Sequence, residues 1–172
     1  MLSQKVLMDE IKLAEYDPLW QSLFLSEADT ISDALWHVAP IVIYIGSMAV
    51  PGLCSKPTID ILTGVKDLKD EMIITSLESF GYIHQLDACE PDRIFFCKGS
   101  SRNHHIHVVK LQSWTFWRYI IFRDYVLSYP EICARYGDLK RAIAESYRHD
   151  MTTYTESKIG FIESTMKKAT LE

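Results

Sequence analysis

The sequence predicts one mixed α+β domain, in which helices cover a mixed or antiparallel sheet and a helical segment follows. Two observations lead to this fold class. Short apolar runs rich in β-branched residues occur between positions 41 and 109, and turn-forming residues separate them. From position 114 onward, apolar residues recur at helical spacing. We therefore expect a single domain over 1–172, with the first helix and the sheet at about 16–112 and the C-terminal helices at 113–170.

Length and composition allow one well-packed domain and exclude several classes of protein. The chain has 172 residues, of which 48% are hydrophobic, enough for one core but not for two. Its apolar runs are too short to cross a membrane, and acidic residues near the N-terminus argue against a secretory signal. The four cysteines stand too far apart for a Cys-x-x-Cys zinc or redox motif, so we expect a reduced, cytoplasmic protein.

The charge pattern does not indicate a nucleic-acid surface. The formal net charge is -5, and no run of Lys and Arg alternates with aromatic residues. Lys and Arg slightly outnumber Asp and Glu only in residues 87–172, so we expect most cationic contacts to an anionic small molecule to come from that half.

The first predicted element is a helix that starts at Asp17-Pro18 and ends near Ala39-Pro40. Asp can cap free amide groups at a helix start, and Pro is accepted at the first helical position. The apolar side chains of this stretch form one stripe at helical spacing: Trp20, Phe24, Ala28, Ile31 and Leu35. We expect this stripe to cover one face of the sheet.

Two strands follow, at Ile41–Ile45 and Thr58–Val65. The first is β-branched and aromatic throughout, and Gly46 ends it by allowing a turn that a β-carbon would resist. Ser47 then lies at the carboxyl end of that strand. The loop between the strands carries two prolines, which restrict its shape.

Asp60 is the one acid in the second of these strands. A carboxylate in a strand of apolar residues is costly to bury unless a cation or a hydrogen-bond donor meets it. A period of two places Leu62 on the same face as Asp60. Asp60 is therefore the first candidate for a functional side chain.

The later part of the chain is expected to add two strands in a hairpin, one further strand and four helices. In chain order these elements are a helix at Asp67–Phe80, the hairpin strands Tyr82–Leu86 and Arg93–Lys98, a strand at His104–Val109, and helices that begin near Trp114, Pro130 and Asp150.

His105 and His107 are the second candidate pair. In a strand they project to the same side, roughly 7 Å apart along the backbone, close enough to hold one metal ion or to flank one phosphate. The spacing is also compatible with two edge residues that are hydrogen-bonded to their neighbours.

Several motifs together resemble those of the GrpB family, a largely uncharacterised group assigned to the nucleotidyltransferase superfamily. They are YDPLW at 16–20, GSMAVPGLCSKPTIDIL at 46–62, HHIHVV at 104–109 and FRDYVLSYPE at 122–131. The resemblance implies a nucleotidyltransferase-like fold, with Gly46 and Ser47 holding nucleotide phosphates and Asp60 holding a divalent metal. Leu62 stands where the superfamily carries the second acid of Asp-x-Asp, which weakens the case for catalysis.

The resemblance also implies roles for residues elsewhere in the chain. His105 or His107 would complete a metal site with Asp60, and Asp60 and His107 would be catalytic. Four cations would contact phosphate: Lys56, Arg93, Lys140 and Lys158. The alternative for Arg93 and the lysines is a solvated surface charge. The expected metal is magnesium or manganese, with zinc less favoured.

The predicted function is the binding of a nucleotide or a phosphorylated small molecule, with possible transfer of a nucleotidyl or phosphoryl group. Two alternatives stay open. One is a non-catalytic module that binds a nucleotide or another anion. The other is a metal-dependent hydrolase that uses Asp60, His105 and His107.

Overall fold

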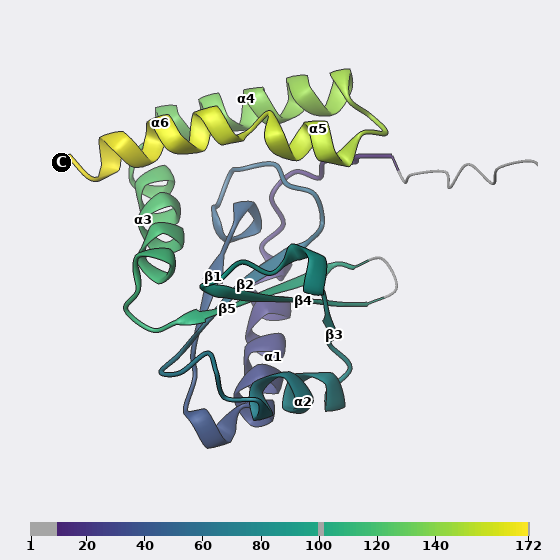
Figure 1. Ribbon diagram of the computed structural model, residues 1–172. Coiled ribbons are helices and arrows are strands. Elements are labelled where there is room, and N and C mark those ends of the chain that lie inside the picture. Colours follow the sequence, from purple (N-terminus) through teal and green to yellow (C-terminus); the bar gives the residue numbers. More distant parts are fainter. Residues whose placement is uncertain (1–9, 100–101, 172) are drawn as a thin grey trace, which may run out of the picture.

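The computed structural model describes residues 10–99 and 102–171. Its centre is one mixed sheet of five strands in the order β1-β2-β5-β4-β3 (Figure 1). The strands are β1 (Ile41–Ile45), β2 (Ile59–Val65), β3 (Ile83–His84), β4 (Arg93–Lys98) and β5 (His104–Lys110). β2 and β5 pair in parallel, whereas the other neighbouring strands are antiparallel. The predicted α+β class is confirmed.

Helices lie on both sides of this sheet. α1 (Leu19–Ala34) and α2 (Met72–Ser79) lie on one side, and the C-terminal helices gather on the other (Figure 1). The C-terminal helices are α3 (Trp114–Ser128), α4 (Pro130–Ser146), α5 (Met151–Glu156) and α6 (Ile159–Ala169). Three short 3-10 turns connect other elements: η1 (Trp36–Val38), η2 (Ser47–Ala49) and η3 (Leu86–Ala88).

The alternation of side chains along β2 gives each face of the sheet its own core. Ile59 and Ile61 are buried with α1 and α2 in the larger core. Leu62 points the other way and packs with Phe116 of α3. Asp60 shares the face of Leu62, so its carboxylate lies on the side of the C-terminal helices.

Four predicted boundaries differ from those of the structure. Helix α1 ends at Ala34 rather than near Ala39, and the separate 3-10 turn η1 follows it. Helix α2 begins at Met72, five residues after Asp67. Before it the chain makes two tight turns: the Asp67 carboxylate accepts a hydrogen bond from the amide of Lys69, and the Asp70 carboxylate accepts one from the amide of Met72. β3 has two residues rather than five. The predicted final helix is two helices, α5 and α6, and Lys158 is the N-cap residue of α6.

No helix within residues 10–99 and 102–171 has the length and apolar character needed to cross a membrane. Cys54, Cys89, Cys97 and Cys133 are free thiols. The cytoplasmic location stays a prediction.

Candidate functional site

Asp60, His105 and His107 meet at the centre of the sheet. β2 and β5 are parallel neighbours, and their register pairs Asp60 with His105 and Leu62 with His107. Residues two apart share a face, so all three polar side chains point the same way. His105 Nδ1 lies 3.4 Å, and His107 Nε2 3.3 Å, from Oδ1 of Asp60. The predicted residues therefore converge on one carboxylate oxygen.

The carboxylate of Asp60 is held in its ionised form. Its side chain is 28% exposed. Burial alone would raise the pKa of Asp60, but the hydrogen bonds with His105 and His107 outweigh it and hold the pKa below its ordinary value. Asp60 is therefore an anion throughout the neutral range.

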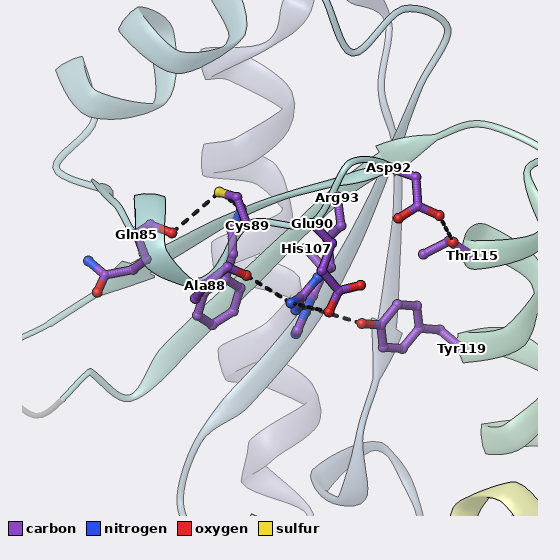
Figure 2. Close-up of polar contacts among 10 residues, drawn as sticks. Gln85, Ala88, Cys89, Glu90, Asp92, Arg93, His107, Thr115 and Tyr119 are labelled. Carbon is purple, nitrogen blue, oxygen red and sulfur yellow. Dashed lines mark hydrogen bonds and ion pairs between the residues drawn. The ribbon is translucent and has the colours of Figure 1, made fainter. Parts of the chain in front are cut away.

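His107 is the more enclosed of the two histidines, with 8% of its surface exposed. Its Nδ1 lies 3.1 Å from Nη1 of Arg93 and 3.5 Å from the hydroxyl of Tyr119 (Figure 2). Burial lowers the pKa of His107, as do the charges of Arg93 and His105, and the hydrogen bond with Asp60 only partly opposes them. His107 is therefore neutral at pH 7.

Gly46 and Ser47 lie directly beside Asp60. Ile45, the last residue of β1, pairs with Asp60 across the antiparallel ladder, and the chain turns away at Gly46 with a φ of +76°. Ser47 and Tyr136 of α4 line the same cavity. The turn predicted at Gly46 thus joins the sheet to the C-terminal helices.

A cavity of about 360 Å³ opens between this end of the sheet and the C-terminal helices. It is lined by Ile45, Gly46, Ser47, Asp60, His107, Arg118, Tyr119, Phe122, Tyr136, Thr155, Lys158, Ile162 and Met166. Five of the predicted site residues are among them. Residues more than a hundred positions apart therefore form one wall.

Lys158 places a cation in this wall. Its ammonium lies 4.4 Å from the centre of the Tyr154 ring. Burial lowers the pKa of Lys158 to about 8, and the charge of Lys56 adds to this effect while Asp60 opposes it. Within residues 10–99 and 102–171, no carboxylate lies within ion-pair distance of this ammonium.

The other predicted phosphate contacts lie outside the cavity lining. Lys140 is 2% exposed and donates to the carbonyl of Cys54. The ammonium of Lys56 lies 3.1 Å from the sulfur of Met151. Arg93 donates to His107. The structure thus gives Lys140 and Arg93 internal hydrogen bonds, and their contact with phosphate stays a prediction.

Eight lining residues were not predicted to belong to the site, and four of them add charge or aromatic surface: Arg118, Tyr119, Phe122 and Tyr136. The aromatic ones belong to stretches whose density of rings is typical of a core helix, and nothing in their spacing separates a cavity wall from a core. Arg118 is the one signal, because it interrupts the aromatic run Trp114–Tyr119 with a charge.

The donor groups do not fit a resident magnesium site. Magnesium takes oxygen ligands in near-ideal octahedral geometry, and this wall offers one carboxylate. Among the residues that the structure describes, no group of three or more His, Cys, Asp or Glu side chains could hold a metal ion. Asp60, His105 and His107 are arranged as a hydrogen-bonded cluster.

Comparison with known proteins gives one family. A family model described as GrpB protein matches residues 10–168. A UPF0157 protein of Pseudomonas aeruginosa is 35% identical over 156 residues, which cover 87% of this chain but 64% of that protein, less than two thirds of its length. The glutamate-rich protein GrpB of Alkalihalophilus pseudofirmus is 31% identical over 166 residues, covering 92% of this chain and 95% of that protein.

Solved structures agree with the sequence comparison. The crystal structure of the conserved protein GrpB from Enterococcus faecalis superposes with a TM-score of 0.85 at 30% identity, over 92% of this chain and 96% of that one. Two more distant chains share the fold alone. A chain of the GLD-2/RNP-8 complex gives a TM-score of 0.55 at 12% identity, over 86% of this chain and 59% of that one. The Cid1 poly(U) polymerase with MgGTP bound gives a TM-score of 0.51 at 10% identity, over 73% of this chain and 42% of that one.

Proposed function

This chain belongs to the GrpB family, and on that premise we propose that its cavity binds the phosphate-bearing part of a nucleotide or of another phosphorylated small molecule. The fold is shared with nucleotidyltransferase-fold proteins, one of which was solved with MgGTP bound. That likeness makes nucleotides the first class of ligand to consider.

The observation that carries the proposal is the environment of Lys158. Lys158 lines the cavity and is partly withdrawn from water, and its ammonium has no carboxylate in ion-pair contact among the described residues. Burial without such a partner disfavours the charged form and lowers the pKa to about 8. An anionic ligand would supply the missing partner, and phosphate is a strong acceptor for lysine.

Other parts of the wall suit the rest of such a ligand. Arg118 adds a second cation and Ser47 a hydroxyl. The rings of Tyr119 and Phe122, both partly exposed, supply apolar surface on which a planar base can stack. Small-molecule sites typically combine such surfaces with a few polar groups.

The proposal assigns any divalent ion to the ligand rather than to the protein. Magnesium usually keeps several waters and is bound through one or two carboxylates together with the phosphates of a substrate. Asp60 would be the one protein ligand for an ion that enters with a nucleotide. Magnesium or manganese would then strengthen binding, and no metal would copurify.

We propose binding rather than efficient transfer of a nucleotidyl group. Leu62 follows Asp60 on the same face of β2 and is fully buried against α3. A second carboxylate at that position is therefore lacking, and phosphoryl transfer depends heavily on metal charge. Saturable binding without turnover is the expected result.

Isothermal titration calorimetry tests the proposal. Tag-free protein is titrated with ATP, CTP, GTP, UTP and inorganic phosphate, each with and without magnesium or manganese. Lys158→Met should weaken binding by about tenfold or more, because it removes a partly buried cation. Lys168→Met, on the exposed side of the same helix, should leave the affinity unchanged. Lack of binding to every ligand would refute the proposal, as would equal affinities in the two variants.

A further inference from the structure

We propose that Arg93 is a positioning residue that fixes the imidazole of His107 in the tautomer with hydrogen on Nε2, so that His107 donates to Asp60 and is not a metal ligand. The inference goes beyond the binding of a phosphorylated ligand. It concerns the hydrogen bonds among three side chains: Asp60 of β2, Arg93 of β4 and His107 of β5.

The first step is the identity of the donor at His107 Nδ1. Nη1 of Arg93 lies 3.1 Å away. A guanidinium carries only donors and stays protonated in proteins, so Nδ1 must accept with its lone pair. A neutral imidazole with a free lone pair on Nδ1 carries its hydrogen on Nε2. That nitrogen lies 3.3 Å from Oδ1 of Asp60, an acceptor.

The second step is that Arg93 is itself held in place. Its Nη2 donates to the carbonyl of Ala88 at 2.9 Å and to Oε1 of Glu90 at 2.9 Å (Figure 2). Its guanidinium carbon lies 5.3 Å from the centre of the Phe95 ring, and its side chain is 14% exposed. A guanidinium fixed at three sites cannot turn away to let Nδ1 carry a hydrogen.

The third step concerns the competing partner. Tyr119 places its hydroxyl 3.5 Å from His107 Nδ1, and a hydroxyl can accept as well as donate. With hydrogen on Nδ1, however, that N–H would face an N–H of Arg93. The doubly protonated form meets the same conflict and places two positive charges together. The nearer and purely donating Arg93 therefore decides the tautomer.

The consequence is a site whose chemistry differs from that of a metal centre. The nitrogen of His107 that faces Asp60 carries a hydrogen, so it has no lone pair for a metal ion. Instead, Arg93 donates to Nδ1 of His107, and Nε2 of His107 donates to Oδ1 of Asp60. Arg93 is thus the reason that His107 does not serve as the metal ligand expected from the sequence.

Nitrogen NMR of the histidine side chains tests the tautomer. The His107 signals of ¹⁵N-labelled protein are identified by their loss in His107→Gln, and long-range coupling to the ring protons then shows which nitrogen carries hydrogen. We expect hydrogen on Nε2 in the wild type and in Tyr119→Phe. Arg93→Met should shift the population toward hydrogen on Nδ1, and Arg93→Lys, which keeps a pure donor, should restore the Nε2 form. Hydrogen on Nδ1 in the wild type would overturn the proposal even if the Arg93 variants do not fold.

Zinc alone serves as the metal probe. Calorimetric titration of tag-free protein with zinc should give the same affinity for the wild type and for His107→Gln. A zinc site of the wild type that disappears in His107→Gln would overturn the proposal. Both experiments are independent of nucleotides, so a failure to bind nucleotides would refute the proposed function and leave the tautomer as it is.

Discussion

Gly46 lies so close to Asp60 that a β-carbon at position 46 would be 2.6 Å from Oδ2 and 2.8 Å from the β-carbon of Asp60. The backbone of Gly46 also has a φ of +76°, a region that L residues rarely adopt. Two independent constraints thus require glycine at the end of β1. They let the carboxylate lie against the main chain of the neighbouring strand and face the cavity.

Gly46→Ala should therefore destabilise the protein by about 2 kcal/mol or more, from backbone strain and from the displacement of Asp60. Urea denaturation measures the free energy of unfolding. Gly160→Ala is the matched control, because a β-carbon at position 160 would meet nothing within 4 Å and the φ of Gly160 is not positive. In helix α6 that change should stabilise by at most about 1 kcal/mol. Equal stability of Gly46→Ala and the wild type would contradict the steric argument.

Tyr82 donates to a buried carboxylate on the other face of the sheet. Glu27 of α1 is 9% exposed and Tyr82 2% exposed, and Oε1 of Glu27 accepts from the Tyr82 hydroxyl and from Lys98 at 2.9 Å. Tyr82→Phe leaves the carboxylate with one donor fewer and should destabilise the protein by about 1–3 kcal/mol. Tyr147→Phe, at a 39% exposed tyrosine, should change it by less than about 0.5 kcal/mol. Thermal and urea unfolding compare the variants, and equal losses would exclude a specific hydrogen bond.

The fold was predictable where local patterns carry the information. β-Branched runs predicted β1, β2, β4 and β5 to within a residue or two, and Pro130 predicted the start of α4. The division of the final helix was not predictable, because its apolar residues continue at helical spacing across Lys158. The late start of α2 was not predictable either, because Asp67 and Asp70 fit a helical pattern in the sequence. Only the structure shows that their carboxylates accept hydrogen bonds from backbone amides in turns.

The site was predictable in its parts but not in its assembly. Asp60 stood out as an acid in an apolar strand, and His105 and His107 stood out by their alternation. These three side chains meet because β2 and β5 are parallel neighbours in the sheet. The pairing could not be predicted from the sequence, since β3 and β4 lie between these two strands along the chain. The role of Arg93 toward His107 likewise depends on the antiparallel pairing of β4 with β5.

His107 should make stability fall as the solution is acidified. Its pKa is lowered in the folded protein by burial and by the charges of Arg93 and His105, against the effect of Asp60. The unfolded chain therefore binds a proton first, and the stabilising contribution of neutral His107 is lost as the pH falls below about 6.5. His107→Gln should flatten the dependence of the unfolding free energy on pH between about pH 6.5 and pH 5. An unchanged slope in this variant would contradict the assignment.

Ligand binding at Lys158 should weaken as the pH rises through about 8. Burial lowers the pKa of Lys158 to about 8 in the free protein, and a bound phosphate raises it because opposite charge favours the ammonium. Above that pH the complex takes up a proton, so the affinity should fall by up to about tenfold per pH unit. Calorimetry from pH 7 to 9, in buffers that differ in ionisation enthalpy, measures both the affinity and the proton uptake. Lys158→Arg keeps its charge over this range and should bind with little dependence on pH, since arginine stays protonated. Equal pH dependence in the wild type and in Lys158→Arg would show that another group takes up the proton.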